Sequence, residues 1–84
     1  MKLFRISQIE NNGYDTYDSA VVVAESAEAA RLLNPMYGDS GIVDDGLKWG
    51  NSCWVGPELV SVEYLGEAAE GLRAGIICAS FNAG

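Results

Sequence analysis

Residues 19–35 read SAVVVAESAEAARLLNP and contain the signals for a strand and a helix in direct succession. Val21, Val22 and Val23 have branched β-carbons, which suit a pleated and largely buried strand. We expect this strand to cover Asp18–Ala24.

A short helix is predicted directly after this strand, over Ala27–Leu33. Ser26 offers its hydroxyl as the N-cap, and Glu28 lies in the first turn, where the helix dipole favours a carboxylate. The helix should end before Pro35, because the residue that precedes a proline is pushed out of the α region. The expected apolar stripe of the helix consists of Ala29, Ala30, Leu32 and Leu33.

Alternating apolar and polar residues predict three further strands, over Leu3–Ile9, Leu59–Leu65 and about Gly75–Phe81. Asn11–Gly13 favours a turn between the first two strands, because Asn and Gly tolerate positive φ. The segment GEAAEG over residues 66–71 supplies a short connector between the last two. Two hairpins with a helix between them predict one α+β domain over residues 1–84: a four-stranded antiparallel sheet, β-β-α-β-β, with the helix on one face.

Residues 35–57 form a long connection that is rich in glycine and aspartate. A loop of this length in a small domain is more often functional than decorative. Tyr37, Trp49 and Trp54 lie within it. These aromatic side chains either fold back over one end of the core, or leave at least one exposed as an anchor for a partner.

The composition excludes several classes of function. The chain has 84 residues with twelve carboxylates, five cations and no histidine, a formal net charge of -7. Nucleic-acid binding depends on Lys and Arg that neutralise phosphates, and anionic membranes attract the same residues, so neither partner is expected. The first residues alternate apolar and polar side chains, so no signal peptide is expected, and no apolar run approaches the roughly 18 to 20 residues that span a bilayer. A cytosolic protein is therefore expected.

Two cysteines are too few for the disulfide framework of a small secreted scaffold. Cys53 and Cys78 are each expected to be small, buried apolar residues, and a single bridge between them stays possible.

Motifs for catalysis and cofactor binding are absent or weak. Without histidine, the commonest general base near neutral pH is missing, and the segment around Lys48 does not match a P-loop. Asp39, Asp44 and Asp45 could offer oxygen ligands to calcium, but their spacing does not follow that of an EF-hand. No catalytic residue, metal site or cofactor is predicted.

The distribution of charge is the strongest functional signal. Every ionised side chain from Glu10 to Ala30 is negative, and from Asp39 to Glu70 only Lys48 opposes seven carboxylates. Such a surface either keeps a small domain in solution or steers the protein toward a basic partner.

Four stretches of the chain carry a resemblance: KLFRISQIENNGYDTYDSAVVVAES near the start, then WGNSCW, VSVEYLGEA and the terminal ASFNAG. Together they resemble a group of short acidic proteins encoded in phages, prophages and bacterial genomes, mostly without assigned function. The resemblance implies a small accessory protein of the bacterial cytoplasm. It also implies similarity to anti-CRISPR and other anti-defence inhibitors.

We therefore expect a non-enzymatic, anti-CRISPR-like inhibitor that binds the basic surface of a host protein or ribonucleoprotein complex. The residues expected to bind this partner are Asp15, Tyr17, Asp18, Glu25, Trp49, Trp54, Glu63, Glu67 and Glu70. One alternative is a structural or assembly protein of a phage, or a homodimer that pairs through the exposed edge of the first or last strand. Another is a module that binds a small ligand in the glycine-rich loop.

Overall fold

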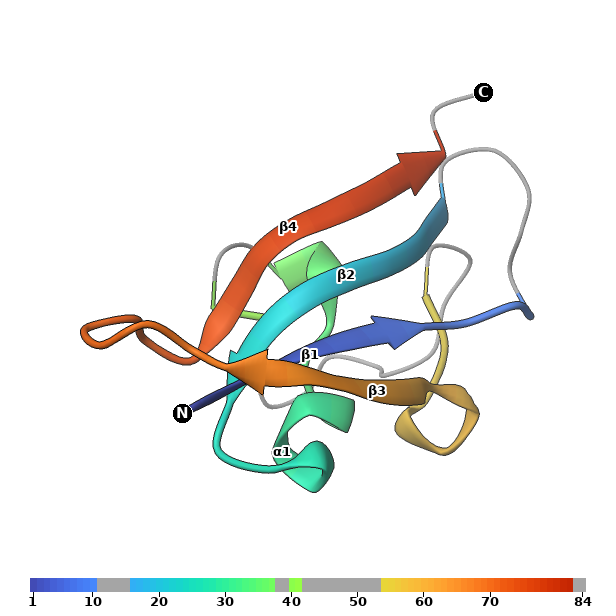
Figure 1. Ribbon diagram of the computed structural model, residues 1–84. Helices are drawn as coiled ribbons and strands as arrows, with labels where there is room; N and C mark the ends of the chain where they lie inside the picture. The colour runs from blue at the N-terminus through green and yellow to red at the C-terminus, as the bar shows by residue number, and fades with distance from the viewer. Residues whose placement is uncertain (11–15, 38–39, 42–53, 83–84) are drawn as a thin grey trace.

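The computed structural model describes residues 1–10, 16–37, 40–41 and 54–82. Within these residues one short helix packs on a four-stranded antiparallel sheet, which confirms the predicted α+β class (Figure 1). The elements in chain order are β1 (Lys2–Ser7), β2 (Thr16–Ala24), α1 (Ala27–Arg31), the 3-10 helices η1 (Pro35–Tyr37) and η2 (Pro57–Leu59), β3 (Ser61–Glu67) and β4 (Gly75–Asn82).

The first hairpin forms as the sequence predicts. β1 and β2 pair antiparallel over six residues, with Phe4 opposite Val22 and Ile6 opposite Ala20. The residues of the predicted turn, 11–13, lie outside the described part of the chain. Val22 and Val23 are both fully buried although successive strand residues point to opposite faces, so β2 occupies the interior of the sheet.

The second predicted hairpin is wrong. The strand order is β3-β1-β2-β4, so the last two strands lie on opposite edges of the sheet and do not pair with each other. Neighbouring strands are about 4.8 Å apart, so three gaps amount to about 14 Å, which the connector over residues 68–74 can span. The first strand, expected at an edge, is therefore central, whereas the last strand is an edge as expected.

Helix α1 begins as predicted and ends two residues early. The Ser26 hydroxyl accepts a hydrogen bond from the backbone N–H of Ala29 at 3.2 Å. Ala30 and Leu33 point into the core, but Leu32, expected in the same stripe, is the C-cap residue and is 52% exposed. The helix stops at Arg31, so the helical periodicity no longer applies to Leu32.

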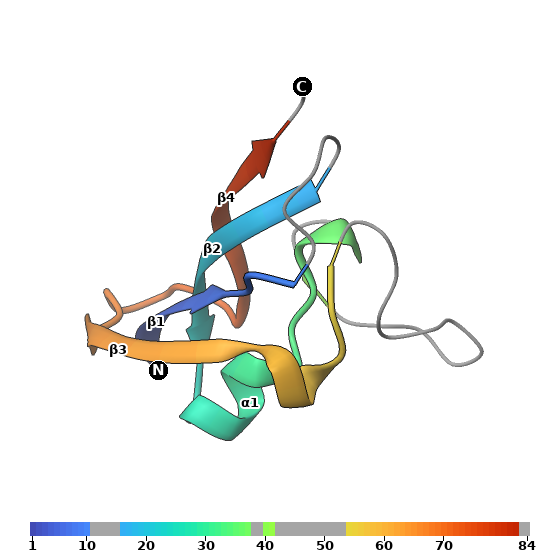
Figure 2. The same cartoon turned by 90° about the vertical axis from the view of Figure 1, so that its right-hand side faces the viewer.

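The core lies between the sheet and the elements on its helix-bearing face. Trp54 is fully buried there and is the largest buried side chain among the described residues. Figure 2 shows α1, η1 and the chain leading into η2 on one side of the sheet, with the β3–β4 connector on the other. The core residues are Phe4, Ile6, Ala20, Val22, Ala24, Ala30, Leu33, Trp54, Val55 and Val60.

Gly41 closes one side of this core. Its φ is +69°, in the left-handed region, and its carbonyl accepts a hydrogen bond from the N–H of Asn34 at 2.8 Å. A Cβ at this position would lie 2.9 Å from Cδ1 of Ile76. Backbone conformation and close packing both require glycine at this position.

Candidate functional site: the acidic edge of the sheet

β3 is an edge strand with an acidic outer surface. Its exposed side chains include Glu63, Tyr64, Leu65 and Glu67, and we call these four residues the acidic edge. Charged residues on an edge strand discourage uncontrolled pairing with other chains. They also present a negative surface, and among the described strands β3 pairs only with β1.

Arg31 fixes the start of this strand. From the end of α1, its Nη1 donates hydrogen bonds to the carbonyl oxygens of Val60 at 2.9 Å and Pro57 at 3.3 Å. Bonds from a charged donor are stronger than neutral ones, so they hold η2 and Val60, the residue directly before β3, against the helix. The predicted helix range, Ala27–Leu33, includes Arg31, but its carbonyl partners come from a distant part of the chain.

Tyr64 lies at the centre of the acidic edge and is 57% exposed. Its ring packs edge-on against Phe4, with centroids 5.8 Å apart, and its hydroxyl donates a 2.6 Å hydrogen bond to Oε2 of Glu67. This hydrogen bond raises the pKa of Tyr64 above the ordinary value of 10.0, with smaller contributions from desolvation and from the charge of Glu67. The two side chains therefore form one oriented polar group on an aromatic support.

Two cations lie on the neighbouring strand. Across the β1–β3 ladder, Lys2 is opposite Glu67 and Arg5 is opposite Glu63. Among the residues that the structure describes, no carboxylate of β3 forms an ion pair with either cation. Glu63 and Glu67 are both exposed, and Glu67 accepts the hydrogen bond from Tyr64.

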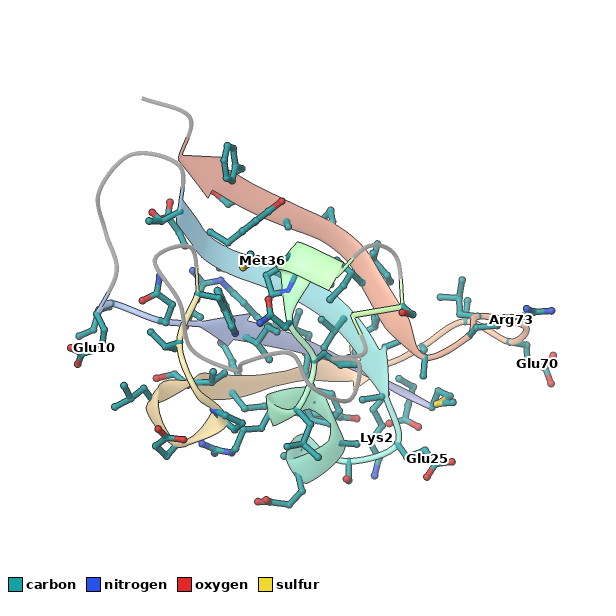
Figure 3. All side chains as sticks on the ribbon, turned by 180° about the vertical axis from the view of Figure 1, so that it is seen from behind. Lys2, Glu10, Glu25, Met36, Glu70 and Arg73 are labelled. Atoms are coloured by element: carbon teal, nitrogen blue, oxygen red, sulfur yellow. The ribbon has the colours of Figure 1, made fainter. Side chains whose placement is uncertain are left out.

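The remaining predicted carboxylates are dispersed. Asp18 and Glu25 lie near opposite ends of β2, which β1 separates from β3. Glu70 lies in the connector, and Figure 3 shows it beside Arg73 at the connector tip, away from the sheet. The structure thus places Glu63 and Glu67 on the same edge strand, on opposite faces of the sheet, and leaves the other described carboxylates of the predicted site apart.

The predicted aromatic anchors have different positions. Trp54 has no exposed surface, so it is part of the core and is not accessible to a partner, in agreement with the alternative that loop aromatics fold back. Tyr17 is half-buried and packs against Phe81, with ring centroids 4.8 Å apart. Asp15 and Trp49 lie outside the described residues.

Some exposed residues were missed at the sequence level. Tyr64 and Leu65 on β3, and Ile77 and Phe81 on β4, are large apolar residues at the two edges of the sheet. Alternation indicates which residues share a face, but exposure at an edge depends on strand order. Cys78, predicted to be buried, is a free and exposed thiol, because it lies on the outermost strand.

Other types of site receive less support within the described chain. A hollow of about 360 Å³ is lined by Ser40, Arg73, Ala74, Gly75 and Ile76, and offers one guanidinium and one hydroxyl. No group of three metal-ligating side chains occurs among the described residues, and the Asp39, Asp44 and Asp45 positions lie outside them. No described helix has the length and apolar character needed to cross a membrane.

Comparison with models of protein families, with curated proteins and with solved structures finds no match to this chain.

Proposed function

We propose that this protein is a non-enzymatic inhibitor that docks the acidic edge of its sheet on a Lys- and Arg-lined surface. The target class is a ribonucleoprotein of a nucleic-acid-targeting bacterial defence system, such as an RNA-guided nuclease. The observation that carries the proposal is an edge strand that exposes Tyr64 and Glu67 on one face of the sheet and Glu63 on the other, without an ion pair to the described cations of β1.

Docking through this edge would combine two kinds of contact. Glu63 and Glu67 steer the approach of a basic surface and raise the association rate. Tyr64 supplies a large, rigid contact area with a polar tip, which is typical of residues that dominate interface energetics. A nuclease surface that binds nucleic acid has the complementary charge, so occupation of that surface would block the nucleic acid.

The test is a cleavage assay with a panel of purified RNA-guided nucleases, each loaded with guide RNA. The proposal expects the wild-type protein to inhibit cleavage by at least one nuclease when added before the target DNA. Inhibition of no member of the panel would contradict this function.

A matched pair of variants separates a specific edge from a general negative field. E63Q/E67Q and D18N/E25Q each remove two exposed carboxylates and change the net charge equally. We expect E63Q/E67Q to weaken inhibition strongly and D18N/E25Q to weaken it little. Equal weakening by both variants would exclude the acidic edge as the docking site.

A further inference from the structure

The opposite edge of the sheet has a different character. β4 (Gly75–Asn82) is the last strand of the order β3-β1-β2-β4, and no described strand pairs with its outer side. Its sequence, GIICASFN, contains no charged residue and no proline. Edge strands usually carry such residues as protection against pairing, so β4 is the less protected of the two edges.

One irregularity limits the part of β4 that can accept another strand. Val21 is opposite Cys78 and Val22 is opposite Ile76, so Ile77 has no partner on β2 and forms a bulge. A second irregularity, between Tyr17 and Ser19, has its extra residue, Asp18, on β2, so β4 itself has no further extra residue from Cys78 to Asn82. A regular ladder on the outer side is therefore expected over these positions, with Ser80 at their centre.

We propose that this edge pairs with a second copy of the chain, antiparallel and around a two-fold axis at Ser80. In this register Ser80 is opposite itself, and Phe81 is opposite Ala79 of the second copy. Phe81 is 45% exposed although one side of its ring contacts Tyr17. A small residue opposite a half-exposed aromatic provides the space that its ring needs, and the symmetry provides this match twice.

Charge also favours a second copy as the occupant. An uncharged strand offers no ion pair to a charged foreign segment, whereas two uncharged strands can approach without placing like charges in contact. Each copy carries a net charge of -7, so the two molecules repel each other at a distance. Added salt screens this repulsion, and pairing through β4 should therefore strengthen with salt.

The expected dimer is weak. A ladder over five residues buries less than the roughly 1,200 Å² of a standard stable interface, so association should depend on protein concentration. The product would be a continuous eight-stranded sheet that leaves the acidic edge of each copy at its two outer ends. This inference uses a different edge from the proposed inhibitory function and does not depend on it.

Sedimentation equilibrium of the wild-type chain and of S80E tests the pairing. The wild-type mass should rise from 8.9 kDa toward twice that value with concentration, and more so at higher salt. S80E places two carboxylates against each other at the axis and should raise the dissociation constant about tenfold or more. S61E, an equivalent change at an exposed serine of β3, should have a much smaller effect.

Cross-linking tests the register. Opposed residues of an antiparallel pair have Cα atoms about 4.5 to 5.5 Å apart, within the range that a disulfide bridges. With Cys53 and Cys78 replaced by serine, S80C should form an intermolecular disulfide rapidly. In this register two Cys78 residues are offset by about 13 Å, so C53S alone should cross-link slowly.

A wild-type chain that stays monomeric at all concentrations and salt levels would overturn the inference, as would a dimer that S80E leaves intact. Rapid cross-linking at Cys78 with none at S80C would overturn the register. S80E should retain nuclease inhibition, so a failure of the pairing and a failure of the proposed function are distinguishable.

Discussion

Arg5 on β1 and Glu63 on β3 occupy directly opposite positions in the sheet, yet they form no ion pair within the described residues. Arg5 is exposed, so its charge reaches the solvent beside the acidic edge. It reduces the negative potential that a basic partner meets there.

Replacement of Arg5 should therefore improve binding. In R5Q the edge loses a neighbouring cation, and a unit charge at about 6 Å in water is worth about 0.7 kcal/mol. We expect about threefold tighter binding of the inhibited nuclease at low salt, measured by surface plasmon resonance. Unchanged or weaker binding would indicate that docking does not involve the β3 side of the sheet.

Tyr64 should titrate at higher pH than an ordinary tyrosine, because Glu67 accepts a hydrogen bond from its protonated hydroxyl. E67Q should lower the pKa of Tyr64 toward 10.0. Ultraviolet absorbance titration measures this, with the Y64F difference spectrum to isolate Tyr64 from the other tyrosines.

The same hydrogen bond predicts the sign of a pH effect on stability. The pKa of Tyr64 in the folded state lies above its value in the unfolded chain. The hydrogen bond therefore contributes fully to the free energy of unfolding below pH 10.0, and this contribution is lost as the pH rises through the raised pKa. Denaturation of wild type and E67Q should therefore converge at strongly alkaline pH. A stability advantage of wild type over E67Q that grows with pH in this range would contradict the assignment of the raised pKa to the Tyr64–Glu67 hydrogen bond.

Gly41 should tolerate substitution less well than Gly71, although both have positive φ, +69° and +87°. At Gly41 an added Cβ meets Ile76 and Leu33, whereas at Gly71 it meets nothing within 4 Å. We expect G71A to cost about 1 kcal/mol for backbone strain alone and G41A to cost more. Urea denaturation compares them, and equal losses would show that Ile76 moves away without cost.

Substitutions of Trp54 and Tyr64 should affect different properties, the first stability and the second nuclease binding. W54F removes part of a fully buried side chain and should cost about 1 to 3 kcal/mol of unfolding free energy, with nuclease binding unchanged. Y64A removes an exposed side chain, so it should weaken nuclease binding and change the unfolding free energy little. Loss of nuclease binding in correctly folded W54F would indicate that Trp54 contributes to the binding surface.

Local signals predicted the elements well, whereas long-range pairing had no local signal. Ser26 and Pro35 bounded the helix region, and the valines of β2 indicated a buried strand. The pairing of β3 with β1 depends on contacts distant in sequence, and the predicted hairpin of β3 with β4 followed from chain proximity alone. The strand order depends on which strands are buried on both faces, and this burial is a property of the assembled sheet.

The site was predicted in part for the same reason. The composition and the charge pattern identified Glu63 and Glu67 as candidates, together with carboxylates that the fold places on β2, after it and in the β3–β4 connector. Trp54 is of a residue type that often anchors interfaces, but it is buried in the core. Tyr64 was predicted to alternate with polar residues of its strand, and only its place on an edge makes it accessible.

The salt dependence of nuclease binding tests the central claim most directly. For the nuclease that the chain inhibits, dissociation constants of wild type, E63Q/E67Q and D18N/E25Q would be measured between about 50 and about 300 mM salt, where the Debye length shortens from about 14 Å to about 6 Å. The account predicts that wild-type binding weakens with salt, that E63Q/E67Q binds weakly with a much smaller salt dependence, and that D18N/E25Q resembles wild type. Salt-independent wild-type binding, or a wild-type slope retained by E63Q/E67Q, would contradict docking through the acidic edge.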